Sequence, residues 1–218
     1  SKRSSEDPFY IKETVEGNHA RMDEESKSWI NYRQGNMIHD EIFPELGLSF
    51  EDDSIGIITP YRKQCETLSQ LFPKNIQIET VHKFQGKEMD VIIFSTVANQ
   101  VDSFIADPKL INVAVSRAKN KFVLATHYGC EKGNNLIASL IRYIRYHSGT
   151  ISFSKICSIY DILYSQKKTE SFLSKFPLLS KLVISEHITT IILNEILQYS
   201  NYSSLNFYNN YRLNDLII

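Results

Sequence analysis

Four short strand-like segments, three of them apolar and one alternating between apolar and polar residues, are separated by longer stretches in the first 126 residues, and this order limits the folds open to the chain. We predict strands at residues 55–59, 76–80, 90–97 and 121–126. The β-branched run at 90–97 is long enough for a buried central strand. We predict helices at residues 28–43, 62–72 and 110–119. Strands that alternate with helices form a parallel sheet with helices on both faces, so we expect an α/β fold.

The sequence changes character after residue 126, where helical spacing replaces the alternation. We predict helices at 136–144, 154–164 and 188–196, and a terminal strand within 204–218. The polar residues 1–27 are interpreted as a leader or a connection from a preceding domain. We therefore expect this leader, an α/β domain at residues 28–147, and a smaller, mainly helical extension at residues 148–218.

Composition excludes several classes of protein. The longest apolar runs, such as residues 91–94, are far shorter than the roughly 20 residues that span a bilayer, and no signal peptide is recognisable. The three cysteines, Cys65, Cys130 and Cys157, include no CxxC pair, which favours reduced thiols over disulfides or a metal site. We predict a cytoplasmic protein with no membrane partner.

The charge distribution is more informative than the net charge of −1. Residues 40–53 hold six acids and no base, whereas residues 109–121 hold four bases and no acid. Residues 59–87 hold five bases and two acids. Basic charge is therefore concentrated in the middle of the chain, although such a cluster is usually a solvated face.

Three segments carry recognisable polar patterns. Residues 80–90 read Thr-Val-His-Lys-Phe-Gln-Gly-Lys-Glu-Met-Asp directly before a predicted strand, and the glycine permits close backbone approach. Residues 112–119 read Asn-Val-Ala-Val-Ser-Arg-Ala-Lys, which places Arg117 on a helix of small or apolar residues. Residues 55–62 read Ile-Gly-Ile-Ile-Thr-Pro-Tyr-Arg, a strand that ends as a helix opens. Each has an ordinary alternative: a turn glycine, a surface arginine and a βα turn.

Loops at the carboxyl ends of parallel strands usually carry the chemistry of such folds. Here those loops begin at Thr59, Thr80, Val97 and Thr126. We therefore expect functional residues at this end of the sheet.

Together, and in this order, the three segments resemble motifs IV, V and VI of superfamily 1 helicases, nearest to the branch that includes the nonsense-mediated-decay helicase. The resemblance covers residues 28–127 and implies a RecA-like parallel sheet, a P-loop NTPase-like fold. Residues 28–31, Ser-Trp-Ile-Asn, resemble the start of the family's first helix in this lobe. Many relatives have Glu-Ala a few residues after that asparagine, where Gln34 and Gly35 stand here.

The resemblance implies a role for each matched residue. Arg117 would be the arginine finger that reaches the γ-phosphate of ATP held by a companion lobe. Gln85, Gly86 and Glu88 would face the nucleotide, and Arg33 is a further candidate for the γ-phosphate. Single-stranded DNA or RNA would be held by Thr59, Thr80, His82, Lys83 and Lys87.

The sequence contains no P-loop of the form GxxxxGK[ST], and no apolar strand ends in Asp-Glu. We therefore expect ATP with Mg²⁺ to be bound mainly by an N-terminal RecA-like domain of the same polypeptide, and this chain alone to be inactive. The alternatives are a non-catalytic RecA-like module that binds nucleic acid or protein, and an accessory lobe of a nuclease or defence protein. Residues 128–218 resemble the segment that leads to a restriction-type nuclease in some bacterial relatives, with Glu186 in its first helix, but no downstream acidic pair with Glu-x-Lys follows.

Overall fold

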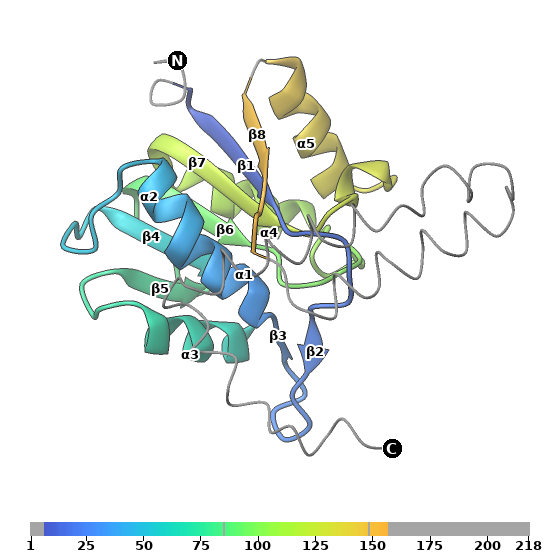
Figure 1. Cartoon of the computed structure of the whole chain (residues 1–218), viewed down its shortest axis with the longest axis horizontal. Helices are drawn as coiled ribbons and strands as arrows, with labels where there is room; N and C mark the ends of the chain where they lie inside the picture. The colour runs from blue at the N-terminus through green and yellow to red at the C-terminus, as the bar shows by residue number, and fades with distance from the viewer. Residues whose placement is uncertain (1–6, 85, 148, 157–218) are drawn as a thin grey trace, which may run out of the picture. The chain divides into compact units, whose positions relative to one another are not determined.

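A six-stranded parallel sheet forms the centre of the part of the chain that the structure describes (Figure 1). The structure is a computed structural model that describes residues 7–84, 86–147 and 149–156. Along the sheet the order is β5-β4-β6-β7-β1-β8. The strands are β1 (Phe9–Glu13), β4 (Ile55–Thr59), β5 (Gln77–Thr80), β6 (Met89–Ser95), β7 (Ala118–Thr126) and β8 (Thr150–Phe153). A short antiparallel ribbon, β2 (Arg21–Met22) and β3 (Trp29–Ile30), lies outside this sheet.

Helices cover both faces of the sheet, as the alternation predicts (Figure 1). The first face carries α1 (Tyr32–Met37), the π-helix η1 (Ile38–Ile42), α2 (Phe43–Glu45) and α3 (Arg62–Leu71). The second carries α4 (Pro108–Ser116) and α5 (Leu136–Tyr146), with the short 3₁₀ helix η2 (Cys130–Lys132) just before α5. Neighbouring residues of a strand point to opposite faces of the sheet: Ile57 packs in the hydrophobic core under the helices of the first face, and Ile58 in the core under those of the second. The predicted α/β, RecA-like sheet is confirmed.

The sheet extends beyond the boundaries that the sequence suggested. Strand β1, within the polar segment interpreted as a leader, lies inside the sheet between β7 and β8. Strand β8 begins at Thr150, after the expected end of the α/β domain at residue 147. Residues 154–156, the start of the helix predicted at 154–164, are not helical; the rest of that helix, the helix predicted at 188–196, the strand predicted within 204–218 and Glu186 lie outside the described residues.

The predicted helix at 28–43 is shorter at its start and longer at its end. Trp29 and Ile30 are in β3, and Asn31 caps α1 because its side-chain oxygen accepts a hydrogen bond from the Gln34 amide at 3.0 Å. The predicted helix stops at residue 43, before Pro44, but in the structure Pro44 lies in the first turn of α2, where a proline needs no amide partner. The π-helical register of η1 immediately precedes it.

An eight-residue crossover without a helix joins β5 to β6. Phe84, in the middle of this crossover, is fully buried over β4. An added Cβ on Gly56 of β4 would lie 2.6 Å from Phe84 Cζ. Only glycine therefore lets the aromatic ring reach the sheet, and this contact fixes the path of the segment that resembles motif V.

Candidate functional site

Arg117 and the Gly86 turn lie at the same end of the sheet, where β6 and β7 begin; we call this end the amino edge. Arg117 caps the end of α4, and its carbonyl accepts a hydrogen bond from the Met89 amide at 2.9 Å. Gly86 precedes Met89 by three residues and has a φ of +86°, a conformation that favours glycine. The helix ends at Ser116, so Arg117 lies at the cap and not, as predicted, within the helix.

The Arg117 side chain has hydrogen-bonding capacity to spare. It is half-buried, and its Nη2 donates to Ser116 Oγ at 3.1 Å. Its Nε is buried and has no hydrogen-bond partner among the described residues. A guanidinium offers five donors in a rigid fork, and leaving one unpaired when buried costs roughly 1–3 kcal/mol. Glu88 and Lys87 are exposed beside it, whereas Gln85 lies outside the described residues. This group fits an anionic ligand.

A second group of predicted residues lies where β4 and β5 end, which we call the carboxyl edge. Thr59 and Thr80 are register partners at the ends of these strands. The exposed His82 and Lys83 follow Thr80, whose carbonyl accepts from the Lys83 amide at 3.0 Å. With Arg62 they line a groove of about 690 Å³. Thr59 itself is fully buried, with its hydroxyl near the Tyr61 amide at 3.5 Å, so it shapes the turn and presents no surface to a ligand.

The candidate residues therefore divide between two opposite ends of the sheet. Thr80, His82 and Lys83 lie at the carboxyl ends of strands, where we expected functional residues, whereas Arg117, Gly86 and Glu88 lie at the opposite end. Lys87, expected with the strand-binding residues, lies with Arg117, because the crossover carries it to the start of β6.

Arg33 does not join Arg117. It lies on α1, is 7% exposed, and its Nη1 donates to the Ile156 carbonyl at 2.6 Å. The cap of the same helix, Asn31, donates to the Val97 carbonyl at the opposite end of β6. The nucleotide role suggested for Arg33 is not supported by this position, because its guanidinium holds the chain after β8.

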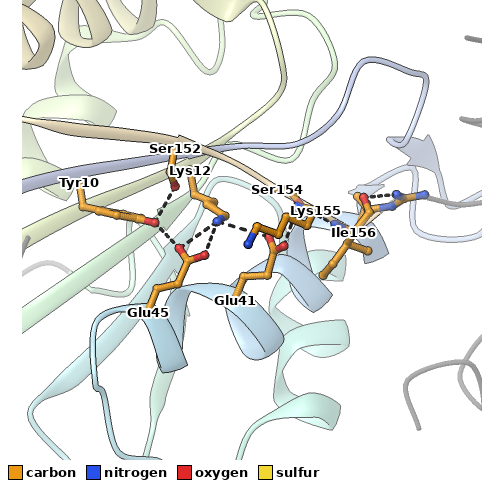
Figure 2. Close-up of polar contacts among 9 residues, drawn as sticks. Tyr10, Lys12, Glu41, Glu45, Ser152, Ser154, Lys155 and Ile156 are labelled. Atoms are coloured by element: carbon orange, nitrogen blue, oxygen red, sulfur yellow. Dashed lines mark hydrogen bonds and ion pairs between the residues drawn. The ribbon is translucent and has the colours of Figure 1, made fainter. Parts of the chain in front are cut away.

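The contacts around residues 152–156 continue into a partly buried ionic cluster of Tyr10, Lys12, Glu41, Glu45 and Ser152, in which the Glu45 side chain is 37% exposed (Figure 2). Lys12 Nζ lies 2.7 and 2.8 Å from the two Glu45 oxygens. The Tyr10 hydroxyl donates to Glu45 and lies 2.6 Å from Ser152 Oγ. Glu41 Oε1 accepts from the Lys155 amide at 2.6 Å. The cluster joins β1 and β8 to η1 and α2, the helices on the first face that carry Glu41 and Glu45.

Sequence reasoning missed a buried amide network at the end of β6. Gln34 Oε1 accepts from Ser95 Oγ at 2.8 Å and from the Val97 amide at 2.9 Å. Gln64 Oε1 accepts from the Asn31 amide at 2.8 Å. Val97 has a φ of +67°, which is rare for a β-branched residue and costs on the order of 1–3 kcal/mol. The network stabilises this strained turn. The one sequence feature that pointed to it was Gln34, which stands where relatives have Glu.

Two of the cysteines lie within the described residues, and both are free thiols. Burial is the main cause that raises the pKa of the Cys65 thiol to about 12, so it is protonated and unreactive beside the groove. Among the described residues, no three His, Cys, Asp or Glu side chains gather closely enough to hold a metal ion. The described part of the chain also contains no helix with the length and apolar character needed to cross a membrane.

Comparison with known proteins agrees with this geometry. A family model described as an AAA domain matches residues 1–128, more than half of the chain. The chain is 30% identical over 128 residues to an uncharacterised ATP-dependent helicase of Methanocaldococcus jannaschii, covering 57% of this chain and 19% of that protein. It is 32% identical over 112 residues to the DNA replication ATP-dependent helicase/nuclease DNA2 of Homo sapiens, covering 48% and 10%. It is also 32% identical over 121 residues to the probable RNA helicase armi of Drosophila melanogaster, covering 48% and 10%.

The parallel sheet, the three motifs and the matched family define a helicase domain. The chain belongs to the AAA domain family of superfamily 1 helicases, in the DNA2/NAM7-like branch. It spans only about a tenth to about a fifth of the length of the three relatives described.

Proposed function

We propose that this chain is the second RecA-like lobe of an ATP-dependent helicase and that Arg117 is its arginine finger. The observation that carries the proposal is the half-buried Arg117 guanidinium with an unpartnered Nε at the amino edge. A structural arginine uses its donors within the fold, whereas a finger keeps them for charge on a transferring phosphoryl group. Gln85, Gly86 and Glu88 would line the nucleotide beside it.

In this proposal ATP with Mg²⁺ is held mainly by a companion lobe that carries the P-loop and docks on the amino edge. ATP supplies the phosphoryl group and the energy of its hydrolysis. Arg117 donates hydrogen bonds to the developing negative charge, and the Met89–Arg117 backbone contact keeps it at a fixed height on the sheet. Closing and reopening of the two lobes would then produce steps along a single strand.

The carboxyl edge would hold that single strand of DNA or RNA. Thr80, His82 and Lys83 are the accessible members of the predicted track, and Arg62 adds a second cation to their groove. Contacts to phosphate oxygens are independent of sequence and depend on salt. Thr59 would act indirectly, by fixing the turn that presents Tyr61 and Arg62.

The decisive test of the helicase reading is strand-stimulated ATP hydrolysis. We would express the chain with its upstream region and measure ATP turnover with and without a single-stranded oligonucleotide. The proposal predicts turnover that rises when the strand is added. A polypeptide that binds the strand but never hydrolyses ATP would instead be a non-catalytic binding module.

The track can be tested separately on the 218-residue chain. Binding of a labelled single strand should weaken steeply with salt, and Lys83→Ala should lower the slope of log affinity against log salt by about one. Lys87→Ala is the matched control, because Lys87 lies at the amino edge and should leave that slope unchanged. A salt response that is flat in the unmodified chain would refute the track.

A further inference from the structure

A second groove, of about 260 Å³, opens at the carboxyl edge beyond the proposed track. It is lined by the segment that follows β6, including Gln100, and by the segment that follows β7, including His127, Tyr128 and Gly129. None of these residues belongs to the three helicase motifs. The groove combines a buried polar atom without a partner, an aromatic ring and a nearby cation.

The buried polar atom is Nδ1 of His127. His127 is 8% exposed, and its Nε2 lies 2.6 Å from the Gly17 carbonyl, which can only accept. Nε2 therefore carries a proton, and in the neutral imidazole Nδ1 is an acceptor. That atom has no hydrogen-bond partner among the described residues. A buried acceptor of this kind is complementary to an N–H or O–H group of a ligand.

The aromatic ring is Tyr128, the residue that follows. It is 38% exposed, whereas most large apolar side chains of the described domain are buried. Lys132 Nζ lies over one face of its ring, 5.5 Å from the ring centre, and the ring of Phe153, at the end of β8, has its centre 6.2 Å from that of Tyr128, so a base would stack on the part of the ring that Lys132 leaves open. An exposed ring beside a cation is the combination on which unpaired bases stack while the adjacent phosphate is neutralised.

The location is compatible with the proposed strand track. Strand β7 is two positions from β4 in the sheet, so their carboxyl ends are separated by roughly 10 Å. A single strand that follows the carboxyl edge from Lys83 reaches the segment after β7 within a few nucleotides. Asn99 does not compete for a ligand, because its side-chain oxygen accepts from the His19 and Ala20 amides at 3.0 Å.

We propose that this groove takes one unstacked nucleobase of the bound single strand. Tyr128 provides the stacking surface and His127 Nδ1 accepts a hydrogen bond from an N–H of the base, while Lys132 attracts the neighbouring phosphate. The proposal rests on the strand track of the proposed function. It adds a contact to the base where the track contacts only the backbone.

The test uses the full 218-residue chain and a fluorescein-labelled twelve-nucleotide thymidine strand, with binding followed by anisotropy. Loss of one stacked base corresponds to roughly a fivefold to 150-fold change in affinity, so Tyr128→Ala should weaken binding at least fivefold. Tyr128→Phe keeps the ring and should bind like the unmodified chain. Tyr146→Ala is the matched control, because Tyr146 is 84% exposed on α5 and should have no effect.

A strand with one abasic position, moved along the oligonucleotide in a series, sharpens the test. One position should weaken binding to the unmodified chain by the same factor as Tyr128→Ala, and Tyr128→Ala should be insensitive to it. If Tyr128→Ala binds normally while Lys83→Ala lowers the salt slope, the base pocket is wrong and the track stands. If the chain shows no salt-dependent binding of the strand at all, both the track and the pocket fail.

Discussion

Lys12 and Arg117 are both withdrawn from solvent, but their surroundings differ. Lys12 is 1% exposed and lies within 2.8 Å of both Glu45 oxygens and 3.7 Å from Glu41. Arg117 is half-buried, with one neutral side-chain partner, Ser116, and an unpartnered Nε. The carboxylates that neutralise Lys12 come from the first helical layer, whereas no described carboxylate forms an ion pair with Arg117.

The contrast separates a cation that supports the fold from one that is free for a ligand. Breaking a buried ion pair leaves an uncompensated charge, so Lys12 is tied to stability. A guanidinium with unused donors adds little to stability, and its hydrogen bonds can be made with a ligand. The Tyr10 hydroxyl, like Lys12, supports the fold. Burial, and then its hydrogen bond to Glu45, raises its pKa, so it stays protonated and keeps donating to Glu45.

The largest expected effect is on turnover. Arg117→Ala should lower strand-stimulated ATP hydrolysis on the order of 10³-fold or more, because transition-state charge loses its donor. The midpoint of urea unfolding should stay close to that of the unmodified protein. Lys109→Ala removes the same charge from an exposed position on the same helix and should leave turnover intact. Normal turnover in Arg117→Ala would show that Arg117 does not act on a ligand and so does not differ from Lys12 in this way.

The next largest effect is on stability. Lys12→Met removes the cation shared by Glu41 and Glu45 and should destabilise the chain by about 1–3 kcal/mol, measured by urea unfolding, because Glu41 is buried while Glu45 can regain water. A second change, Glu45→Gln, should restore part of that loss. Lys63→Met is the control, because its ion pair with Glu66 is exposed and its unfolding midpoint should barely move. Equal effects of the two lysine variants would show that the Lys12 cluster has no special role in stability.

Packing, and not charge, holds the segment beside Arg117. Gly56→Ala places a Cβ 2.6 Å from Phe84 Cζ and 2.9 Å from Ile92 Cδ1, so it should cost about 1–3 kcal/mol of unfolding free energy. Combining it with Phe84→Leu should recover part of the loss. The Gly35→Ala control meets only flexible leucine side chains, at 3.1 Å or more, and should cost less. If the losses of unfolding free energy in Gly56→Ala and Phe84→Leu simply add in the double variant, the two residues are not in contact.

Glu13, the neighbour of Lys12 on β1, should produce the smallest effect. Burial, with Glu131 next, raises the pKa of its carboxyl above the ordinary value, and its Oε1 has no hydrogen-bond partner among the described residues. The folded state therefore holds this proton to higher pH than the unfolded state, and stability should fall as pH rises through that window. Glu13→Gln should flatten this part of the profile of unfolding free energy against pH. Parallel profiles would show that Glu13 does not titrate in this way.

The sequence predicted the motif-bearing half of the sheet well. Strands β4, β6 and β7 contain apolar runs and β5 alternates apolar and polar residues, so their type follows from local pattern. Strand β1 was missed because Lys12 and Glu13 interrupt its apolar character. Lys12 can be buried only because Glu41 and Glu45, about thirty residues away in sequence, reach it.

The candidate site was predicted less evenly. The resemblance to helicase motifs identified Arg117 and Gly86, whose shared position at the amino edge depends on a crossover that no local pattern reveals. The position of Arg33 depends on the Ile156 carbonyl, 123 residues later in the chain. The His127 groove combines segments after β6 and β7 with no shared motif, so only the folded arrangement brings them together.

The most direct test of the central claim is a crystal structure of the polypeptide with its upstream region, bound to ADP, Mg²⁺ and aluminium fluoride. The fluoride complex mimics the transferring phosphoryl group. Our account predicts an Arg117 guanidinium nitrogen about 3 Å from a fluorine atom, across a closed cleft between two lobes. An Arg117 side chain that remains on Ser116 and faces solvent in that complex would contradict it.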